Sequence, residues 1–475
     1  MHVAIIGAGY SGLAAATAFL SFGHSVVIFD SSPDVGGVWS STNHYPGLKA
    51  QNTGDTYRFS TLPMPREYPL HPDCCQIQAY MEFYAQKHHL DKEGRLRLKT
   101  RVILAKKTDD GWMIQAHSAD HGDQWFTFDY LICAAGVFSQ PKIPTFQGTE
   151  RFTAAGSVIV HTSNVHRLND FGEKHIVVIG YGKSACDVAV SASSISKAVI
   201  IVARDVTWKL PTYIGGVVHY SFFILTRFGE SLFLYIRPWF SQRFLNHGIG
   251  KRIRAIIFGV MSWVIMIQLR LVNLGLLPNQ PFETIAGSGL SLATPGFVEA
   301  AQQGKIKMER GVTVESLGER VVSLSNGHVL PADVIVCGTG WKQDIPSFLP
   351  EEYRNEIINK AGDWILYKHI LPTDAPDLAF IGYNSSIFCP LTAEISSIWL
   401  AAHLELLPDL VRSLPDKESQ PKDAEEEVGW FRRRTNGHHA SVMASGTSVV
   451  PFSLSNIDER TQDLDCEIGW LDWLK

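Results

Sequence analysis

The sequence predicts an α/β protein with two parallel-sheet domains, the second inserted into the first. Two observations support this prediction. A short apolar strand followed directly by a glycine-rich turn occurs at residues 2–12 and again at 175–185, and strand-like segments ending in glycine follow at 129–136 and 332–341. The chain has 475 residues, of which 45% are hydrophobic and 19% charged, which excludes a disordered or fibrous protein. This length favours two or three domains with large buried cores.

Charge and cysteine content narrow the class of protein. The net charge is −5, from 42 Lys and Arg against 47 Asp and Glu, so the chain has no basic footprint for nucleic acid. Its 7 cysteines include no CxxC pair and no zinc-type spacing, so we expect no metal site and no disulfide framework. The apolar segment 3–20 lacks the basic start and cleavage site of a signal peptide, and no run reaches ~18 apolar residues. These features predict a cytoplasmic protein.

The first unit consists of an apolar strand, a GxGxxG turn, a helix and a second strand, at residues 2–6, 7–12, 13–22 and 26–29. Gly7 permits the tight turn, Gly9 lets the backbone approach a pyrophosphate, and Gly12 allows the helix to pack closely on the strand. The helix start then offers free N–H groups to the phosphates. Asp30 follows the second strand and is placed to accept hydrogen bonds from a ribose diol. This pattern predicts a Rossmann-like dinucleotide-binding domain.

The same unit recurs as strand, glycine-rich turn, helix and strand at residues 175–179, 180–185, 186–192 and 198–202. Gly180, Gly182 and Ser184 lie in its turn and are predicted to contact a second nucleotide. Arg204, instead of an acid, follows the last strand, and a guanidinium pairs with a 2′-phosphate that a carboxylate would repel. Lys209 is a candidate second charge for that phosphate. We therefore expect FAD or NAD on the first unit and NADPH on the second, although a surface salt bridge would also explain Arg204.

The two later strand-like segments define the expected domain order. Both are predicted to run to the nucleotide edge of a sheet and to need small residues there, and the segment 332–341 is expected to close the first fold. The first part of the FAD-binding domain is thus expected at residues 1–150. The inserted NADPH-binding domain follows at 151–330 and contains an apolar insertion at about 212–280. The second part of the FAD-binding domain, with a C-terminal tail, is expected at 331–475.

Over roughly residues 1–405 the sequence resembles the flavin-containing monooxygenases, single-chain enzymes that use FAD and NADPH. The motifs that carry the resemblance are GAGYSG, GGVW, GYGKSACD, CGTGW and LYKHILPTDAPDLAFIGY, at residues 7–12, 36–39, 180–187, 337–341 and 366–383. The resemblance implies that NADPH reduces FAD and that O2 adds to the flavin C4a atom. The resulting hydroperoxide would then transfer one oxygen to a soft nucleophile, an amine nitrogen or a thioether sulfur, of a small organic or secondary-metabolite substrate.

The resemblance also implies roles for single residues. Asn52 aligns with an active-site asparagine beside the flavin, where an amide donor would stabilise developing negative charge; alternatively, Asn52 is a turn residue. Val38 and Trp39 resemble positions that line the flavin, and Val102 resembles a backbone contact to adenine. Thr392 is expected to start a helix whose amino end points at the flavin pyrimidine, or simply to cap an ordinary helix.

Two departures from family patterns bear on the reaction. The family fingerprint F-x-G-x-x-x-H-x-x-x-[YF] is stretched over residues 152–166, with Val165 or His166 at the aromatic position. Its histidine, His161, is also explained as a linker residue that bonds backbone. Baeyer–Villiger monooxygenases are the nearest rivals, but their second motif is interrupted here by an extra residue, and Gln51 stands where they have aspartate. Ketone oxidation is therefore the alternative to N- or S-oxygenation.

Residues 255–267 form an apolar run inside the insertion, flanked by Lys251, Arg252, Arg254 and Arg270. At ~1.5 Å per residue the run spans about 20 Å, which is too short for a bilayer core of ~30 Å. It is interpreted either as a buried helix covering the active site or as a peripheral membrane contact through residues 251–270. The charged segment 416–427 is expected to be a solvated linker.

Other functions were weighed against the monooxygenase. A thiol–disulfide flavoreductase needs a spaced redox pair, whereas Cys74 and Cys75 are adjacent. A nucleotide-binding protein with an inactive site would bind both cofactors without oxidising NADPH. The expected partners are a small-molecule substrate and O2, with no nucleic acid, and the sequence leaves a homo-oligomer open.

Overall fold

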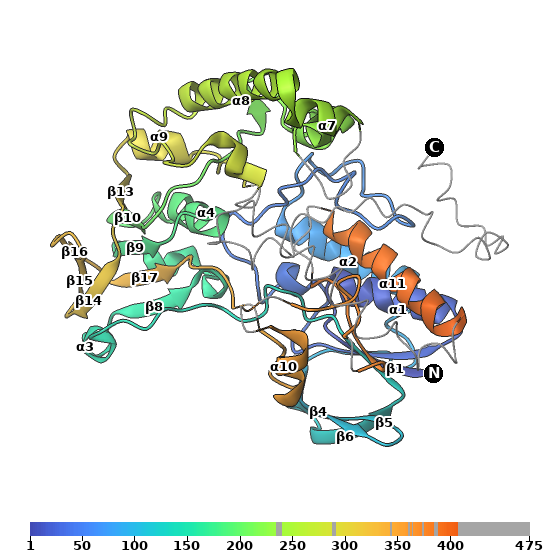
Figure 1. The fold of residues 1–475 in the computed structure, drawn as a ribbon. Coiled ribbons are helices and arrows are strands. Elements are labelled where there is room, and N and C mark those ends of the chain that lie inside the picture. Colours follow the sequence, from blue (N-terminus) through green and yellow to red (C-terminus); the bar gives the residue numbers. More distant parts are fainter. Residues whose placement is uncertain are drawn as a thin grey trace.

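The fold described below is that of a computed structural model, which describes residues 1–233, 240–286, 291–342, 344–359, 362, 364–372, 375–383 and 388–406. Two five-stranded parallel sheets, each with helices packed on it, form the body of the protein (Figure 1). The predicted linker 416–427 lies outside the described residues. No helix among the described residues is both long and apolar enough to cross a membrane.

The first sheet has the strand order β18-β7-β1-β2-β3. Its strands are β1 (His2–Ile6), β2 (Ser25–Phe29), β3 (Leu96–Arg97), β7 (Tyr130–Cys133) and β18 (Leu378–Phe380). Helix α1 (Tyr10–Ser21) follows β1 through the glycine-rich turn and packs against α11 (Cys389–Leu406). An antiparallel sheet of β4 (Thr100–Thr108), β5 (Gly111–Ser118) and β6 (Gly122–Phe128) lies beside it. The predicted strand–turn–helix–strand unit at the amino terminus is therefore confirmed.

The second sheet has the order β13-β10-β9-β17-β8. Its strands are β8 (Val158–His161), β9 (His175–Ile179), β10 (Ala198–Ala203), β13 (Ile306–Arg310) and β17 (Val334–Cys337). Helix α4 (Lys183–Ala192) follows β9, as the repeated motif predicts. A small antiparallel sheet, β14 (Val314–Gly318), β15 (Val321–Leu324) and β16 (Val329–Pro331), adjoins it. The predicted α/β class with two Rossmann-like sheets is confirmed.

The strand at 332–341 does not close the first fold, which corrects the expectation from sequence. It is β17, which lies between β9 and β8 and pairs Cys337 with Ile179 on one side and His161 on the other. β18 completes the first sheet instead. The second sheet therefore extends past residue 330. The reason for the error is physical: all four residues of β17 are buried and apolar, so the segment fits the interior of either sheet equally well.

Further helices are α2 (Cys74–Lys87), α3 (Thr149–Ala154), α5 (Ser221–Ile224), α6 (Arg227–Ser231), α7 (Phe240–Asn246), α9 (Phe297–Gln302) and α10 (Glu352–Ile357); a short hairpin is formed by β11 (Tyr213–Ile214) and β12 (Val218–His219).

The apolar insertion forms α8 (Gly248–Gln268), which lies with α7 at the outer edge of the molecule (Figure 1). One face of α8 is buried through Phe258, Met261 and Ile265, which join the core of the second domain. The opposite face is apolar and exposed. The interpretation of this run as a buried helix is therefore correct for one face only.

Candidate functional site

The first glycine-rich turn is closed by backbone contacts that exclude side chains. Gly7 has φ +115°, and a Cβ there would lie 2.5 Å from the carbonyl oxygen of Ala134, at the end of the neighbouring strand β7. A Cβ on Gly12 would overlap the carbonyl of Gly7. Gly9 is the N-cap of α1 and differs from both, because its Cβ would make only an ordinary contact of 3.5 Å with Gly37. Gly9 is thus the position where space is left for something other than protein.

Asp30 directly follows β2, as predicted, and its carboxylate stabilises the first glycine-rich turn through a hydrogen bond. One carboxylate oxygen accepts a hydrogen bond from the backbone N–H of Ala8 at 2.7 Å, and the other accepts one from Ser32 at 2.8 Å. The backbone carbonyl of Asp30 accepts from the N–H of Thr100 at 2.8 Å, which fixes the start of β4. Val102 lies in that strand and is half-buried. The structure therefore gathers Asp30, the turn and Val102 at one edge of the sheet.

The GGVW segment packs against this turn. The N–H of Gly36 donates to the carbonyl of Ala8 at 3.0 Å, which brings the segment alongside the turn. Val38 is exposed, whereas the Trp39 ring is buried and its Nε1–H donates to the hydroxyl of Tyr57 at 3.1 Å. The two predicted flavin-lining residues thus flank the glycine-rich turn.

The second glycine-rich turn repeats the backbone arrangement of the first. Gly180 has φ +112°, and a Cβ there would overlap the carbonyl of Gly338 at the end of β17. Gly182 is the N-cap of α4. Ser184 lies in the first turn of α4, where its hydroxyl accepts from the Thr162 hydroxyl at 3.4 Å. The third motif position is Ala185, which is fully buried.

The two predicted phosphate-binding cations lie in different surroundings. Arg204 follows β10, its side chain is 77% exposed, and it forms a surface ion pair with Asp205 at 3.1 Å. Lys209 is only 5% exposed; its ammonium donates to the hydroxyl of Ser291 at 3.2 Å and lies 4.7 Å from the ring centroid of Tyr181. Burial lowers the pKa of Lys209. The Arg204 side chain is therefore exposed to solvent beside Asp205, whereas Lys209 is engaged inside the domain.

Asn52 lies where the first domain meets the insertion. Its side chain is 7% exposed, and its backbone carbonyl accepts from the His71 ring at 3.1 Å. The preceding residue, Gln51, is held from two sides: its carbonyl accepts from the hydroxyl of Tyr220 at 2.5 Å, and its side-chain oxygen accepts from the N–H of Leu292 at 2.9 Å. The hydrogen-bonded turn starts after Asn52, at Thr53. Asn52 thus occupies a buried junction rather than an exposed turn.

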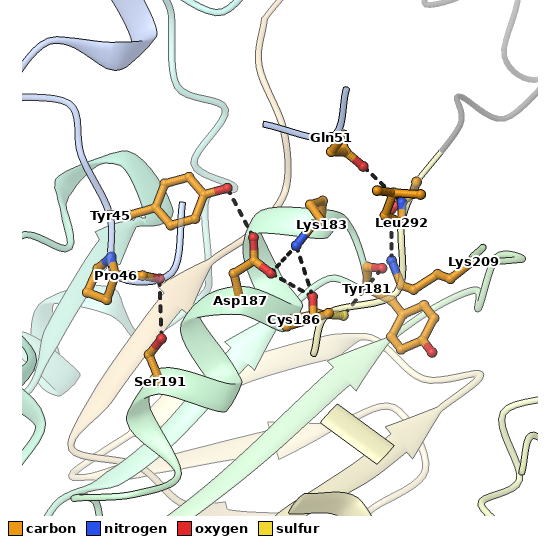
Figure 2. A network of polar contacts seen from close by, with 12 residues as sticks. Tyr45, Pro46, Gln51, Tyr181, Lys183, Cys186, Asp187, Ser191, Lys209 and Leu292 are labelled. Atoms are coloured by element: carbon orange, nitrogen blue, oxygen red, sulfur yellow. Dashed lines mark hydrogen bonds and ion pairs between the residues drawn. The ribbon is translucent and has the colours of Figure 1, made fainter. Parts of the chain in front are cut away.

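A polar network connects the two domains near Asn52 (Figure 2). The carboxylate of Asp187 on α4 forms an ion pair with Lys183 and accepts from the hydroxyl of Thr294 at 2.6 Å. From the first domain, the Tyr45 hydroxyl donates to the same carboxylate at 3.4 Å. Ser191 donates to the carbonyl of Pro46 at 3.3 Å. The segment around residue 45 is thereby held against α4.

His161 lies at the end of β8 and contacts the segment that follows β17. It is buried, one ring nitrogen lies 3.0 Å from the carbonyl oxygen of Gly340, and the other accepts from the N–H of Ser163 at 3.2 Å. Its ring meets Trp341 edge-on at 4.8 Å between centroids. Burial lowers the pKa of His161, which favours the neutral ring. His161 thus bonds backbone as expected, but it is the last residue of β8 and not part of a linker.

Helix α11 begins at Cys389, three residues before the predicted start at Thr392. Thr392 is not the cap: its hydroxyl donates to the carbonyls of Phe388 and Cys389, one helical turn back. The earlier start was readable from Pro390, because proline favours the first turn of a helix.

Glu394 on this helix is buried, and burial raises its pKa to about 7 although Ser60 donates two hydrogen bonds to the carboxylate.

An open cleft of about 620 Å³ lies beside Asn52, and no sequence motif predicts it. Its lining comes from both the first domain and the insertion: Thr53, Asp55, Leu70, Tyr213, Val217, Val218, His219, Ser221 and Phe222. His219 faces His71 with 3.3 Å between their Nε2 atoms, which links the cleft wall to the residue that bonds Asn52. The two parts of this wall are more than 140 residues apart, so no sequence pattern joins them.

Two parallel sheets, each with a glycine-rich turn at the carboxyl end of its central strand, form the architecture of an oxidoreductase that binds two dinucleotides. Comparisons with known proteins narrow this class. Residues 1–282 match the model of the family described as flavin-binding monooxygenase-like. A relative named "probable flavin-containing monooxygenase 1" from Arabidopsis thaliana is 28% identical, over 98% of this chain and 91% of that protein.

Solved structures of similar fold include S-allyl-L-cysteine S-oxygenase from Allium sativum, with a TM-score of 0.62, 18% identity, and coverage of 96% of this chain and 87% of that one. Cyclohexanone monooxygenase from Rhodococcus sp. Phi1 bound to NADP+ gives a TM-score of 0.66 at 16% identity, over 93% and 90% of the two chains. At these identities the similarity shows the fold alone.

The chain belongs to the flavin-binding monooxygenase-like family. It is a flavin-dependent monooxygenase that acts on a small molecule with O2. The family resemblance drawn from the motifs is thus confirmed.

Proposed function

We propose that the protein uses FAD and NADPH to transfer one oxygen atom of O2 to an amine nitrogen or a thioether sulfur. FAD is held by the first domain, through the Gly9 gap and Asp30, and NADPH by the second domain, through the turn at Gly180 and Arg204. The domain division follows the sheets, with residues 151–337 as the inserted domain. When bound, the flavin supplies the activation of O2, and the chain positions it and excludes water.

The cleft beside Asn52 is the substrate site. Its walls supply apolar side chains, Leu70, Val217 and Phe222, together with the exposed carboxylate of Asp55. An exposed carboxylate at the rim of an apolar cleft attracts a cation with an organic body, which describes a protonated amine. A neutral thioether fits the same walls without that attraction. This combination of walls and charge is the observation that carries the proposal.

The test is product analysis with a matched amine, thioether and ketone of one carbon skeleton, each with NADPH and O2. We expect an N-oxide or hydroxylamine and a sulfoxide. Asp55→Asn should raise the KM for the amine several-fold and leave that for the thioether unchanged, whereas Asp110→Asn, at an exposed acid of the β4–β5 turn, should change neither. Conversion of the ketone to an ester with no oxidation of the other two would overturn the proposal in favour of Baeyer–Villiger chemistry.

The exposed face of α8 supports peripheral contact with an anionic lipid surface. Six apolar residues are 42% to 68% exposed and follow one another at intervals of three and four, which places them along one side of the helix: Ile249, Ile253, Ile256, Val260, Trp263 and Ile267. Between residues 231 and 282 the sequence contains six Arg and Lys and no acid. Apolar residues can enter the headgroup layer while basic residues such as Lys251 and Arg252 meet lipid phosphates.

Co-sedimentation with vesicles tests this contact. Vesicles with anionic lipid should bind the wild type more strongly than neutral ones, and Ile256→Glu with Trp263→Glu should abolish binding. Val329→Glu, at an exposed apolar residue of β16, is the matched control and should bind normally. A concentration-dependent dimer that the α8 variants disrupt, without vesicle binding by the wild type, would show that α8 joins copies of this chain instead.

A further inference from the structure

His44, Cys74 and Cys75 come together at the start of α2. One ligand atom of each, a ring nitrogen and the two Sγ atoms, lies within 4.8 Å of the others. About thirty residues separate His44 from the two cysteines in the sequence, so the spacing of these residues does not predict a zinc site. His44 and Cys74 are half-buried, and Cys75 is exposed. Three soft or borderline donors thus meet at a point that opens to solvent.

Backbone contacts hold the two segments of this cluster together. The N–H of Cys74 donates to the carbonyl of Leu48 at 3.2 Å, and Lys49 and Asp73 form an antiparallel bridge. Asp73 is the N-cap of α2 and accepts from the N–H of Gln76 at 2.9 Å. Cys74 and Cys75 are therefore the first two residues of the helix, and their positions are fixed by the helix start.

The orientation of His44 matches that of a metal ligand. Its Nε2 lies 2.5 Å from the carbonyl oxygen of Trp39, and a carbonyl accepts, so Nε2 carries the proton. The other ring nitrogen, Nδ1, is then unprotonated and has a lone pair. A ligating histidine in proteins almost always donates its second ring N–H to such a carbonyl or to a carboxylate, which fixes tautomer and ring orientation.

We propose that His44 Nδ1, Cys74 Sγ and Cys75 Sγ bind a thiophilic divalent cation such as Zn²⁺, with solvent in the fourth position. With bonds of about 2.0–2.3 Å, ligand atoms of a tetrahedral zinc ion lie ~3.3–3.8 Å apart, so the cluster closes by about 1 Å. Exposed Cys75 can supply this movement by side-chain rotation. Each thiol releases its proton to solvent as the metal–sulfur bond forms.

The proposed ion would connect segments that matter for both cofactors. The residue bonded by His44 is Trp39, which packs beside the first glycine-rich turn. The backbone carbonyl of His44 also lies 3.2 Å from the ring Nδ1 of His166, which stands between β8 and β9 in the second domain. A metal at this point fixes the loop from Trp39 to His44 against α2. We therefore expect bound Zn²⁺ to raise the melting temperature of the holoenzyme.

Equilibrium dialysis of the FAD-loaded, thiol-reduced and metal-free enzyme against Zn²⁺ tests the site. We expect one saturable Zn²⁺ per chain, and His44→Ala and Cys75→Ser should each weaken its binding by roughly 10- to 100-fold or more. His166→Ala keeps all three ligands and removes a neighbouring imidazole, so it should bind Zn²⁺ as the wild type does. Flavin content and circular dichroism confirm that each variant folds.

Two further measurements make the outcome decisive. Cd²⁺ in place of Zn²⁺ should give an ultraviolet thiolate-to-metal absorption that Cys75→Ser weakens and His44→Ala keeps in part. Zn²⁺ should also protect Cys75 from thiol reagents. Absence of saturable Zn²⁺ binding, or equal binding by wild type, His44→Ala and Cys75→Ser, would overturn the proposal, because any metal would then be held elsewhere in the chain.

Discussion

The two glycine-rich turns share one backbone design but place their tightest contact differently. In both, the first glycine has a positive φ, +115° at Gly7 and +112° at Gly180, and faces the carbonyl of a neighbouring strand end, at Ala134 and Gly338. At the third motif position the first turn requires Gly12, because a Cβ there would overlap the carbonyl of Gly7. The second turn has Ala185 at that position.

In the second domain the position that requires glycine lies at the end of the facing strand β17 and not on the helix. A Cβ on Gly338 would lie 2.5 Å from the Cβ of Ala185, so glycine is needed on the strand rather than on the helix. The residue after the second strand also differs, with Asp30 bonded into its own turn and Arg204 exposed. The comparison teaches that the motif specifies a turn, whereas the atoms around the third motif position decide whether that position must be glycine.

The largest effect is expected at Gly12. Gly12→Val introduces a side chain into the Gly7 carbonyl, so the turn cannot close and flavin binding should be lost completely. Gly9→Ala meets only an ordinary contact with Gly37, so this variant should fold but lose FAD because the new methyl group blocks the approach of the pyrophosphate. The flavin content of the purified proteins measures both. Ala185→Gly is the control in the second turn and should keep full flavin; full occupancy in Gly12→Val would break the comparison.

Arg204 tests the difference at the strand ends. Loss of a bidentate charged contact costs about 1.5–3 kcal/mol, or roughly 10- to 150-fold in affinity. Arg204→Ala should therefore raise the KM for NADPH by that factor and leave the KM for NADH nearly unchanged. Asp205→Asn removes only the surface partner of Arg204 and should not weaken NADPH. Equal losses with NADPH and NADH would mean that Arg204 is structural.

Asn52 lies between the two halves, and its amide is expected to serve the reaction rather than either nucleotide. Asn52→Asp replaces a donor with a carboxylate that only accepts, in a buried position beside developing negative charge. Product formation should fall by roughly 10²-fold while FAD content stays normal, and NADPH oxidation should yield hydrogen peroxide instead. The matched control is Asn164→Asp, at an exposed asparagine. Normal product yield per NADPH in Asn52→Asp would reduce Asn52 to a structural residue.

The last comparison concerns the stability of the fold and two buried carboxylates, one in each half. Asp187 is paired with Lys183, whereas Glu394 accepts hydrogen bonds from the uncharged Ser60, and burial raises its pKa from the ordinary 4.5 to about 7. The folded protein therefore binds more protons than the unfolded chain between these values, so this group's contribution to stability falls as pH rises from about 4.5 to 7.

Above this window the charged Glu394 costs about 3 kcal/mol. Glu394→Gln should raise the melting temperature at pH 8 and change it little at pH 4.5, whereas Glu319→Gln, at an exposed acid, should do neither. Asp187→Asn should instead lower the melting temperature at pH 8, because it leaves the half-buried Lys183 without its charged partner. A pH-independent effect of Glu394→Gln would contradict the assigned titration.

Sequence by itself determined the two nucleotide-binding units, including Asp30 and Arg204 at their strand ends. Each unit is written in about 30 contiguous residues, because a turn of fixed geometry needs glycine at set positions and the strands beside it need apolar runs. A helix start also depends on neighbouring residues, and the predicted start at Thr392 lies only three residues after the observed start at Cys389.

Only the tertiary structure decided which sheet receives β17, why Lys209 is buried, and how Asp55 and Val217 come to share a cleft. It also decided that His44 meets Cys74 and Cys75. A buried apolar strand fits either sheet, and the surroundings of a lysine, a cleft wall or a histidine are set by segments far away in the chain. Such environments arise from packing, which no local spacing of residues records.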